Sequence, residues 1–434
     1  MTPSASPPSP AVPLGYMVIA VLAFVLAAVA LPGVAPALTG HYYHPRVLAL
    51  AHTVTLGWIT LTIVGATYQL VPIILKRPVA SERLGRWALP AFALGVIGVV
   101  GHFWIAEWRG FVCSAALLAV AALIHVVNMG VGVVRAPSSF PARMMGVALA
   151  GLALTVLFGS ALGADRVWAI LPGELFPRLH AHVHLALLGF VLPMVLGVAA
   201  HVYPMFLHAP EPAGVGARVQ LAGIVAGVPI LVAGLLAGAR PAICAGAILV
   251  AAATLTHVGW VLRMVRARKD AALDWPLRFL LAGALALVPA TAMGLALAAD
   301  LVAGPRMALA YAVLALGGWA SLTIVGMLLK IVPFLVWYLV YAPQAGRRPV
   351  PALAQLSWRA GEAAVFALLV PGIALLAVAV ALGDVDVIRA AGVVVALGAL
   401  AFAATMARAV RHVLPAARPR PAEAFAQAAR QPSA

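Results

Sequence analysis

The sequence predicts an all-α membrane protein with about twelve transmembrane helices, arranged as three parallel four-helix pseudo-repeats. Three observations predict this class. The 434 residues are 64% hydrophobic and only 9% charged, with a mean hydropathy of +1.07. Apolar runs of roughly 20 residues, the length that crosses a bilayer core, recur about twelve times. In addition, one pattern of residues occurs three times at nearly regular spacing, which is typical of an internal repeat.

The repeated pattern is a Gly-aromatic pair followed eight residues later by a second Gly and seven residues after that by a Pro. The first glycines of the three copies lie 132 and 129 residues apart. The copies are Gly57-Trp58 with Gly65 and Pro72, Gly189-Phe190 with Gly197 and Pro204, and Gly318-Trp319 with Gly326 and Pro333. Small residues at this spacing allow two helices to approach closely, so each copy predicts a tightly packed transmembrane helix.

The apolar segments divide into three groups of four, and the marked helix is the second of each group. An even number of helices in each repeat makes the repeats parallel. Residues 1–13 and 415–434 are predicted to be disordered, and the repeats to cover 14–134, 144–264 and 277–409. The segments themselves lie near 14–33, 46–75, 87–106, 110–134, 144–163, 180–207, 218–238, 241–264, 277–298, 305–341, 357–382 and 386–409.

The net charge of +16 comes mainly from Lys and Arg in the loops after the even-numbered segments. Cytoplasmic loops of membrane proteins collect such residues, so we expect both termini in the cytoplasm of a bacterial-type inner membrane, and no nucleic-acid partner. The two cysteines, Cys113 and Cys244, form no CxxCH motif, which excludes covalent attachment of a c-type haem.

Histidines, rather than acidic residues, occupy the membrane segments. Ionisable groups at membrane depth are costly and usually mark function. His52 and His184 hold the same position in two repeats, and Val313 holds it in the third. Imidazoles facing each other from neighbouring helices are what a six-coordinate haem iron needs, so His52 and His184 are the predicted axial ligands.

The run from His180 to His184 offers further ligands. His182 lies roughly 200° around the helix from His184, so it is a candidate ligand on the opposite side. His180 and His184 share a face, a spacing suited to one metal ion, and His102 is a further candidate ligand near the same end. A purely structural role is the alternative for each of these histidines.

A second polar layer is expected towards the cytoplasmic side. Gln69, His201 and Lys330 are equivalent in the three repeats and could converge on a central axis, and His125 and His257 are equivalent in the first two. Such a cluster could relay protons, bind an anion or hold helices together. The sequence places no acidic side chain in the middle of a span, so no embedded carboxylate is expected to deliver protons.

At these residues the chain resembles subunit I of the haem–copper oxidase superfamily, most closely its C-family branch and short subunit-I-like relatives. His52-Thr53 with Gly57 resembles the helix that carries one low-spin haem ligand, and His184 with Gly197 and Pro204 resembles the helix that supplies a copper ligand. A second resemblance, around His180-Ala181-His182, is to the NnrS-like haem- and copper-containing membrane proteins.

The chain departs from the oxidase pattern in its third repeat. Tyr311-Ala312-Val313 stands where the family has His-x-His, and the segment 218–238 has no His-His pair to complete a copper site. The usual binuclear oxygen-reducing centre therefore cannot form from matching positions.

The resemblance implies haem b, with copper as a further possible cofactor, and electron transfer or redox chemistry of oxygen or nitric oxide. If the protein is an enzyme, it is expected to be a haem-dependent oxidoreductase. A membrane quinol or a separate cytochrome would supply electrons, and a partner subunit is a further expectation. Two alternatives stay open: a membrane carrier or chaperone for copper or haem that uses the outer histidines, and a structural partner of a true oxidase subunit.

Overall fold

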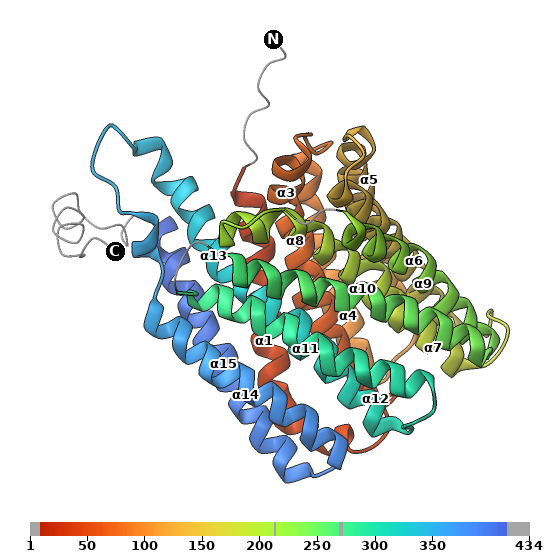
Figure 1. Ribbon diagram of the computed structural model, residues 1–434. Helices are drawn as coiled ribbons and strands as arrows, with labels where there is room; N and C mark the ends of the chain where they lie inside the picture. The colour runs from red at the N-terminus through yellow and green to blue at the C-terminus, as the bar shows by residue number, and fades with distance from the viewer. Residues whose placement is uncertain (1–8, 212–213, 269–271, 415–434) are drawn as a thin grey trace.

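The computed structural model describes residues 9–211, 214–268 and 272–414, and within these ranges it contains helices and no β-strand. Twelve helical segments in the described ranges are long and apolar enough to cross a membrane. Figure 1 shows them as one bundle of long helices. The predicted fold class, a twelve-helix membrane protein, is therefore confirmed.

The helices follow the chain in three successive sets. The first set is α1 (Ala11–Leu38), α2 (Pro45–His52) continued by η1 (Thr53–Thr60) and α3 (Leu61–Leu75), α4 (Glu82–Ile105) and α5 (Arg109–Arg135). The second set is α6 (Phe140–Trp168), α7 (Leu175–His184) continued by η2 (Leu185–Val191) and α8 (Leu192–Leu207), α9 (Val215–Ala237) and α10 (Arg240–Ala267). The third set is α11 (Trp275–Ala298), α12 (Pro305–Ala312) continued by η3 (Val313–Ser321) and α13 (Leu322–Val340), α14 (Arg359–Leu382) and α15 (Val385–Val410). Short 3-10 turns follow at Ala342–Gln344, Leu353–Leu356 and Arg411–Val413.

The helices extend beyond the predicted apolar runs. The prediction of disorder over 1–13 is wrong for its last residues, because α1 begins at Ala11 and buries Val12 and Pro13. Polar caps lengthen other helices: Ser139 accepts a hydrogen bond from the backbone N–H of Ala142, so α6 begins before the predicted 144. Residues 1–8 and the predicted disordered tail 415–434 lie outside the described residues. The exact repeat boundaries stay a prediction.

The three marked helices are the most buried of the twelve. In their most apolar stretches 61%, 67% and 72% of the residues are buried, against 28–44% in the other nine segments of the described chain. The aromatic residues of the repeated pattern, Trp58, Phe190 and Trp319, are almost fully buried. Trp58 also donates a hydrogen bond through Nε1 to Ser321 Oγ, at 3.0 Å, and so joins the first set of helices to the third.

The second glycine of each pattern packs against the first helix of its own set. A β-carbon at Gly65 would lie 2.5 Å from Tyr16 Cβ, one at Gly197 would lie 3.0 Å from Met144 Cβ, and one at Gly326 would lie 2.8 Å from Phe279 Cβ. The close approach predicted from the sequence therefore occurs at equivalent places in α1–α3, α6–α8 and α11–α13.

Each marked helix contains a π-helical segment, which the sequence does not predict. η1 begins directly after His52, η2 begins directly after His184, and η3 begins at Val313, the equivalent position in the third set. π-Helical turns are rare and occur frequently at functional sites. The wider turns thus single out the same positions as the repeated histidines.

Candidate functional site

The α1–α2 connection, which holds His41, and the α11–α12 connection, which holds Asp300, lie at one end of the bundle together with His180 of α7. We call this the His-rich end. The opposite end, which holds Lys330 and His201, is called the basic end. At the His-rich end, helix α7 carries His180, His182 and His184.

His182 and His184 lie on different sides of α7, as their separation of two residues predicts. The ring of His182 contacts Phe158 of α6 with 6.1 Å between centroids, and it lies close enough to His52 for a charge on one imidazole to act on the other. The ring of His184 instead stacks on Tyr311 of α12, with centroids 6.0 Å apart. Helix α7 therefore presents one histidine to the first set of helices and another to the third.

His52 and His184 make the same local hydrogen bond. Nδ1 of His184 lies 2.8 Å from the carbonyl oxygen of His180, and Nδ1 of His52 lies 2.7 Å from that of Leu48. Because a carbonyl oxygen only accepts, Nδ1 carries the proton in both rings. The lone pair of a neutral imidazole is then on Nε2, and a backbone bond of this kind fixes the ring for metal binding. Both rings are thus prepared as ligands through Nε2.

His180 is held differently. Its Nε2 is hydrogen-bonded to the hydroxyl of Tyr42 at 2.9 Å. Burial raises the pKa of Tyr42, so this hydroxyl keeps its proton and is able to donate. The Nε2 atom of His180 is therefore engaged by Tyr42, whereas that of His184 is available.

A cavity of about 360 Å³ opens beside His184. Its walls come from the second and third sets of helices, and leucine, isoleucine, valine and alanine side chains make up most of its lining. His180, His184 and Tyr311 border it, and Trp319 of the repeated pattern also contributes to the wall. Cofactor pockets in proteins are mostly apolar, with volumes of roughly 300–1,000 Å³, and carry a few placed polar groups. This cavity has those properties.

The charged residues of the cavity are a pair. Among its lining residues, all of which the structure describes, the only Arg, Lys, Asp or Glu side chains are Arg240 and Asp300, which form an ion pair. Arg240 begins α10 and also donates to the carbonyl oxygen of Ala298. Both residues lie at the His-rich end, so the charges stand at the mouth of the cavity.

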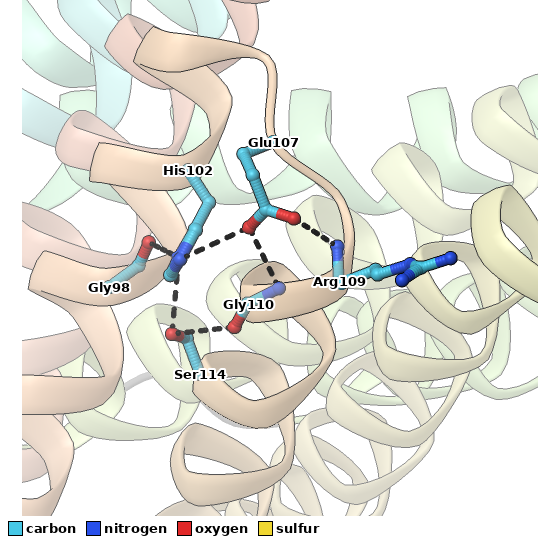
Figure 2. Close-up of polar contacts among 6 residues, drawn as sticks. All are labelled: Gly98, His102, Glu107, Arg109, Gly110 and Ser114. Carbon is cyan, nitrogen blue, oxygen red and sulfur yellow. Dashed lines mark hydrogen bonds and ion pairs between the residues drawn. The ribbon is translucent and has the colours of Figure 1, made fainter.

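His102 lies apart from this cavity, in the last turn of α4 (Figure 2). Its Nδ1 bonds to the carbonyl oxygen of Gly98 at 2.6 Å, and its Nε2 lies 3.5 Å from the carboxylate of Glu107. Glu107 also accepts from the backbone N–H groups of Arg109 and Gly110, and so caps α5. Both nitrogens of His102 thus have partners where α4 meets α5.

Two of the three residues predicted to be equivalent in the inner polar layer, Lys330 and His201, have partners in their own sets of helices. Lys330 Nζ lies 2.6 Å from Asp274 Oδ2 at the start of α11, and His201 Nδ1 lies 3.1 Å from Glu211 Oε1. Gln69 is buried, and its Oε1 has no hydrogen-bond partner. Two of the three equivalent residues therefore have local partners, and the convergence of all three on a central axis stays a prediction.

His125 and His257 are both buried, with 1% and 3% of their surface exposed. His125 Nε2 lies 3.3 Å from Thr67 Oγ1, and its ring packs near Tyr68. His257 packs near Tyr203, in the equivalent helices of the second set. These contacts join neighbouring helices, so they support a structural role for His125 and His257.

We expect His125→Ala to leave any haem spectrum unchanged, because His125 contacts neither His184 nor the cavity. The variant should lose about 1–3 kcal/mol of stability, the usual effect of removing a buried polar partner and its packing. Thermal unfolding of the detergent-solubilised protein measures the loss. A spectrum that changes in His125→Ala would contradict the assignment.

Among the described residues, Glu362 is a buried acidic side chain, with 4% of its surface exposed. It lies in the first turn of α14 and not in the middle of a span. The expectation that no embedded carboxylate delivers protons stays a prediction. The charged groups that act on the Glu362 carboxyl are Asp274, Lys330 and Arg359. They lie at the basic end of the bundle, whereas His184 lies at the His-rich end.

The residues beside the cavity fit a haem better than a copper ion. The cavity offers an apolar space and one imidazole with an available Nε2. Within the described residues, no group of three or more His, Cys, Asp or Glu side chains is placed to hold a metal ion. The predicted metal set of His180, His184 and His102 therefore gains no support from the geometry.

Comparison with known proteins supports the fold. No protein-family model matches the chain, and no curated protein matches its sequence. Among solved structures, the chain is similar to a haem–copper terminal oxidase determined by cryo-EM as a dimer. The TM-score is 0.62 at 11% sequence identity, over 92% of this chain and 84% of that one.

The fold and the twelve spans define the class as a multi-pass, all-α membrane protein. Within that class, the chain shares its fold with this haem–copper terminal oxidase. At 11% identity this similarity concerns the fold and not the chemistry.

Proposed function

We propose that the protein is an integral-membrane haem b protein with a redox role, and that His184 is the axial ligand of a haem in the cavity. The observation that carries the proposal is the position of His184. Its Nδ1 is fixed by the backbone, its Nε2 is available, and its ring borders an apolar cavity of about 360 Å³. A bound haem supplies electron transfer and the binding of small ligands at iron.

The cavity is bordered by His184 but not by His52. A haem in this cavity would therefore be held by one residue of the protein, His184, and would remain able to bind a small molecule. His52 and His182, which lie near each other on the opposite side of α7, form a separate candidate pair for a second haem. Binding of one haem between His52 and His184, as the sequence suggests, stays a prediction that the variants below test.

The proposed setting follows from the same features. The basic loops favour an orientation with the basic end in the cytoplasm of a bacterial-type inner membrane, in which the cavity would face the outer side. Electrons would come from a membrane quinol or a separate cytochrome, because the twelve spans leave no separate donor domain within the described chain. The reaction proposed is electron transfer or the reduction of a small molecule such as oxygen or nitric oxide. A partner subunit is part of the same proposal, and copper is not.

The test is the cofactor content of the purified protein. We expect the detergent-solubilised chain, expressed with an adequate haem supply, to show a Soret band and a pyridine haemochrome spectrum of haem b. Metal analysis in parallel should find iron in proportion to haem. A preparation that holds no haem contradicts the proposal. Haem or copper that leaves during dialysis and appears on the other side of proteoliposomes would instead identify a carrier.

A further inference from the structure

The inner part of the cavity holds two hydroxyl groups with no catalytic or binding role assigned so far. Thr254 of α10 and Thr291 of α11 both line the cavity, and their Oγ1 atoms lie 3.1 Å apart. Thr254 lies 14 residues beyond Arg240 on the same helix, about 21 Å along its axis. The hydroxyl pair is therefore far from the ion pair at the mouth.

The protons of these two hydroxyls can be assigned. Thr254 Oγ1 lies 3.0 Å from the carbonyl oxygen of Ala251, which only accepts, so the single proton of Thr254 is directed there. In the contact between the two threonines, Thr291 must then donate and Thr254 accept. Thr291 thus holds the proton of this pair that can turn towards another acceptor by rotation of its hydroxyl.

The inner part of the cavity suits a small dipolar molecule. The charged residues that line the cavity, Arg240 and Asp300, neutralise each other at the mouth, so nothing beside the threonines would compensate an ion. Most of the other residues that line the cavity are apolar, among them Leu192, Leu287 and Trp319. An uncharged molecule with one acceptor atom would gain a hydrogen bond there without the cost of burying a charge.

We propose that this part of the cavity is a subsite for a small, uncharged, dipolar ligand, and that Thr291 is the hydrogen-bond donor that recognises it. The inference rests on the proposed function, because it assumes that the ligand also reaches the haem held by His184. Thr254 acts as a positioning residue, because it accepts a hydrogen bond from Thr291 and so competes with the ligand for the hydroxyl proton of Thr291. The ligand class is that of carbon monoxide, nitric oxide or oxygen rather than an anion.

Carbon monoxide is the probe that tests this subsite, because a hydrogen bond to its oxygen changes both its stretching frequency and its rate of release. On the reduced, purified protein, Thr291→Val should raise the carbon monoxide stretching frequency and speed release about three- to tenfold, the effect of losing one hydrogen bond. Thr254→Val should act in the opposite direction, because it frees the proton of Thr291.

Thr256→Val is the matched control. Thr256 lies on the same helix as Thr254, donates to the carbonyl oxygen of Ala252 and does not line the cavity, so its spectrum should equal that of the wild type. A haem-containing Thr291→Val protein with an unchanged band and release rate would overturn the subsite alone. If Thr254→Val shifts the carbon monoxide stretching frequency in the same direction as Thr291→Val, the assignment of Thr291 as the donor would be overturned. A wild-type protein without haem would overturn the proposed function, and the subsite with it.

Discussion

Replacing His184 by alanine is expected to remove haem from the cavity and to lower the haem retained there at least about tenfold, because the only imidazole with an available Nε2 on its wall is lost. The His184 ring contributes less to folding than to haem binding, because it is half-buried and its hydrogen-bond and ring-stacking partners are a backbone carbonyl and Tyr311. The measurement is the Soret absorbance per chain after purification, with thermal stability followed in the same sample.

The neighbouring histidines provide the controls. His180→Ala should keep the cavity haem, because the Nε2 of His180 is bonded to Tyr42. His52→Ala separates two accounts of the site. If His52 and His184 bind one iron, as the repeat symmetry suggests, both variants lose the same signal. If His184 binds a haem alone in its cavity, His52→Ala keeps the signal of that haem. It then loses only the signal of the second haem, which His182→Ala also removes.

Replacing Gly151 by alanine is expected to destabilise the whole bundle by about 1–3 kcal/mol or more, the cost of overpacking a filled core. A β-carbon at Gly151 of α6 would overlap the carbonyl oxygen of Gly189 in η2 and lie 2.9 Å from the backbone nitrogen of Phe190. Backbone atoms cannot move aside as a flexible side chain can, so α6 must separate from η2. A lower unfolding temperature and a lower yield of monodisperse protein measure the effect.

Gly130→Ala is the matched control for Gly151→Ala. Gly130 lies inside α5, and a β-carbon there would meet nothing within 4 Å. Alanine has the higher helix propensity, so this variant should be neutral or slightly more stable. Equal unfolding temperatures for Gly151→Ala and the wild type would contradict the tight crossing of α6 and η2.

The sequence predicted the fold well, because the features that determine it repeat. Spans of the required length, the glycines Gly65, Gly197 and Gly326, and the buried Trp58 and Trp319 all follow from a pattern that occurs three times. Each is a local property of one helix or of one helix pair. The ends of the helices were predicted less accurately, for example the start of α1 at Ala11. Caps and packing, rather than the apolar run, determine where such a helix begins.

The site was only partly predictable. Helix geometry predicts that His182 and His184 point to opposite sides of α7, but it does not predict which residues each ring contacts. Nothing in the sequence indicates that Tyr42, from a loop 138 residues away, bonds to His180. The threonines of the cavity also give no signal, because a single Thr in an apolar helix commonly bonds to its own backbone. The burial of Glu362 was not predicted, because this residue lies in the first turn of its helix.

The oxidase fold does not by itself assign chemistry to this chain. The third set of helices has Val313 where the repeat symmetry would place a histidine, and η3 begins there without an imidazole. A site with one available histidine, a polar pair at its inner end and no third metal ligand among the described residues is simpler than a binuclear centre. Such a site suits electron transfer or the binding of a small molecule at one haem.

The most direct measurement is an experimental structure of the purified, haem-containing protein at a resolution that shows the porphyrin. The proposed function predicts the ring in the cavity between α7, α10, α11 and α12, with the iron next to Nε2 of His184. A porphyrin found only on the other side of α7, between His52 and His182, or a cavity filled by side chains or lipid in the haem-containing protein, would contradict it.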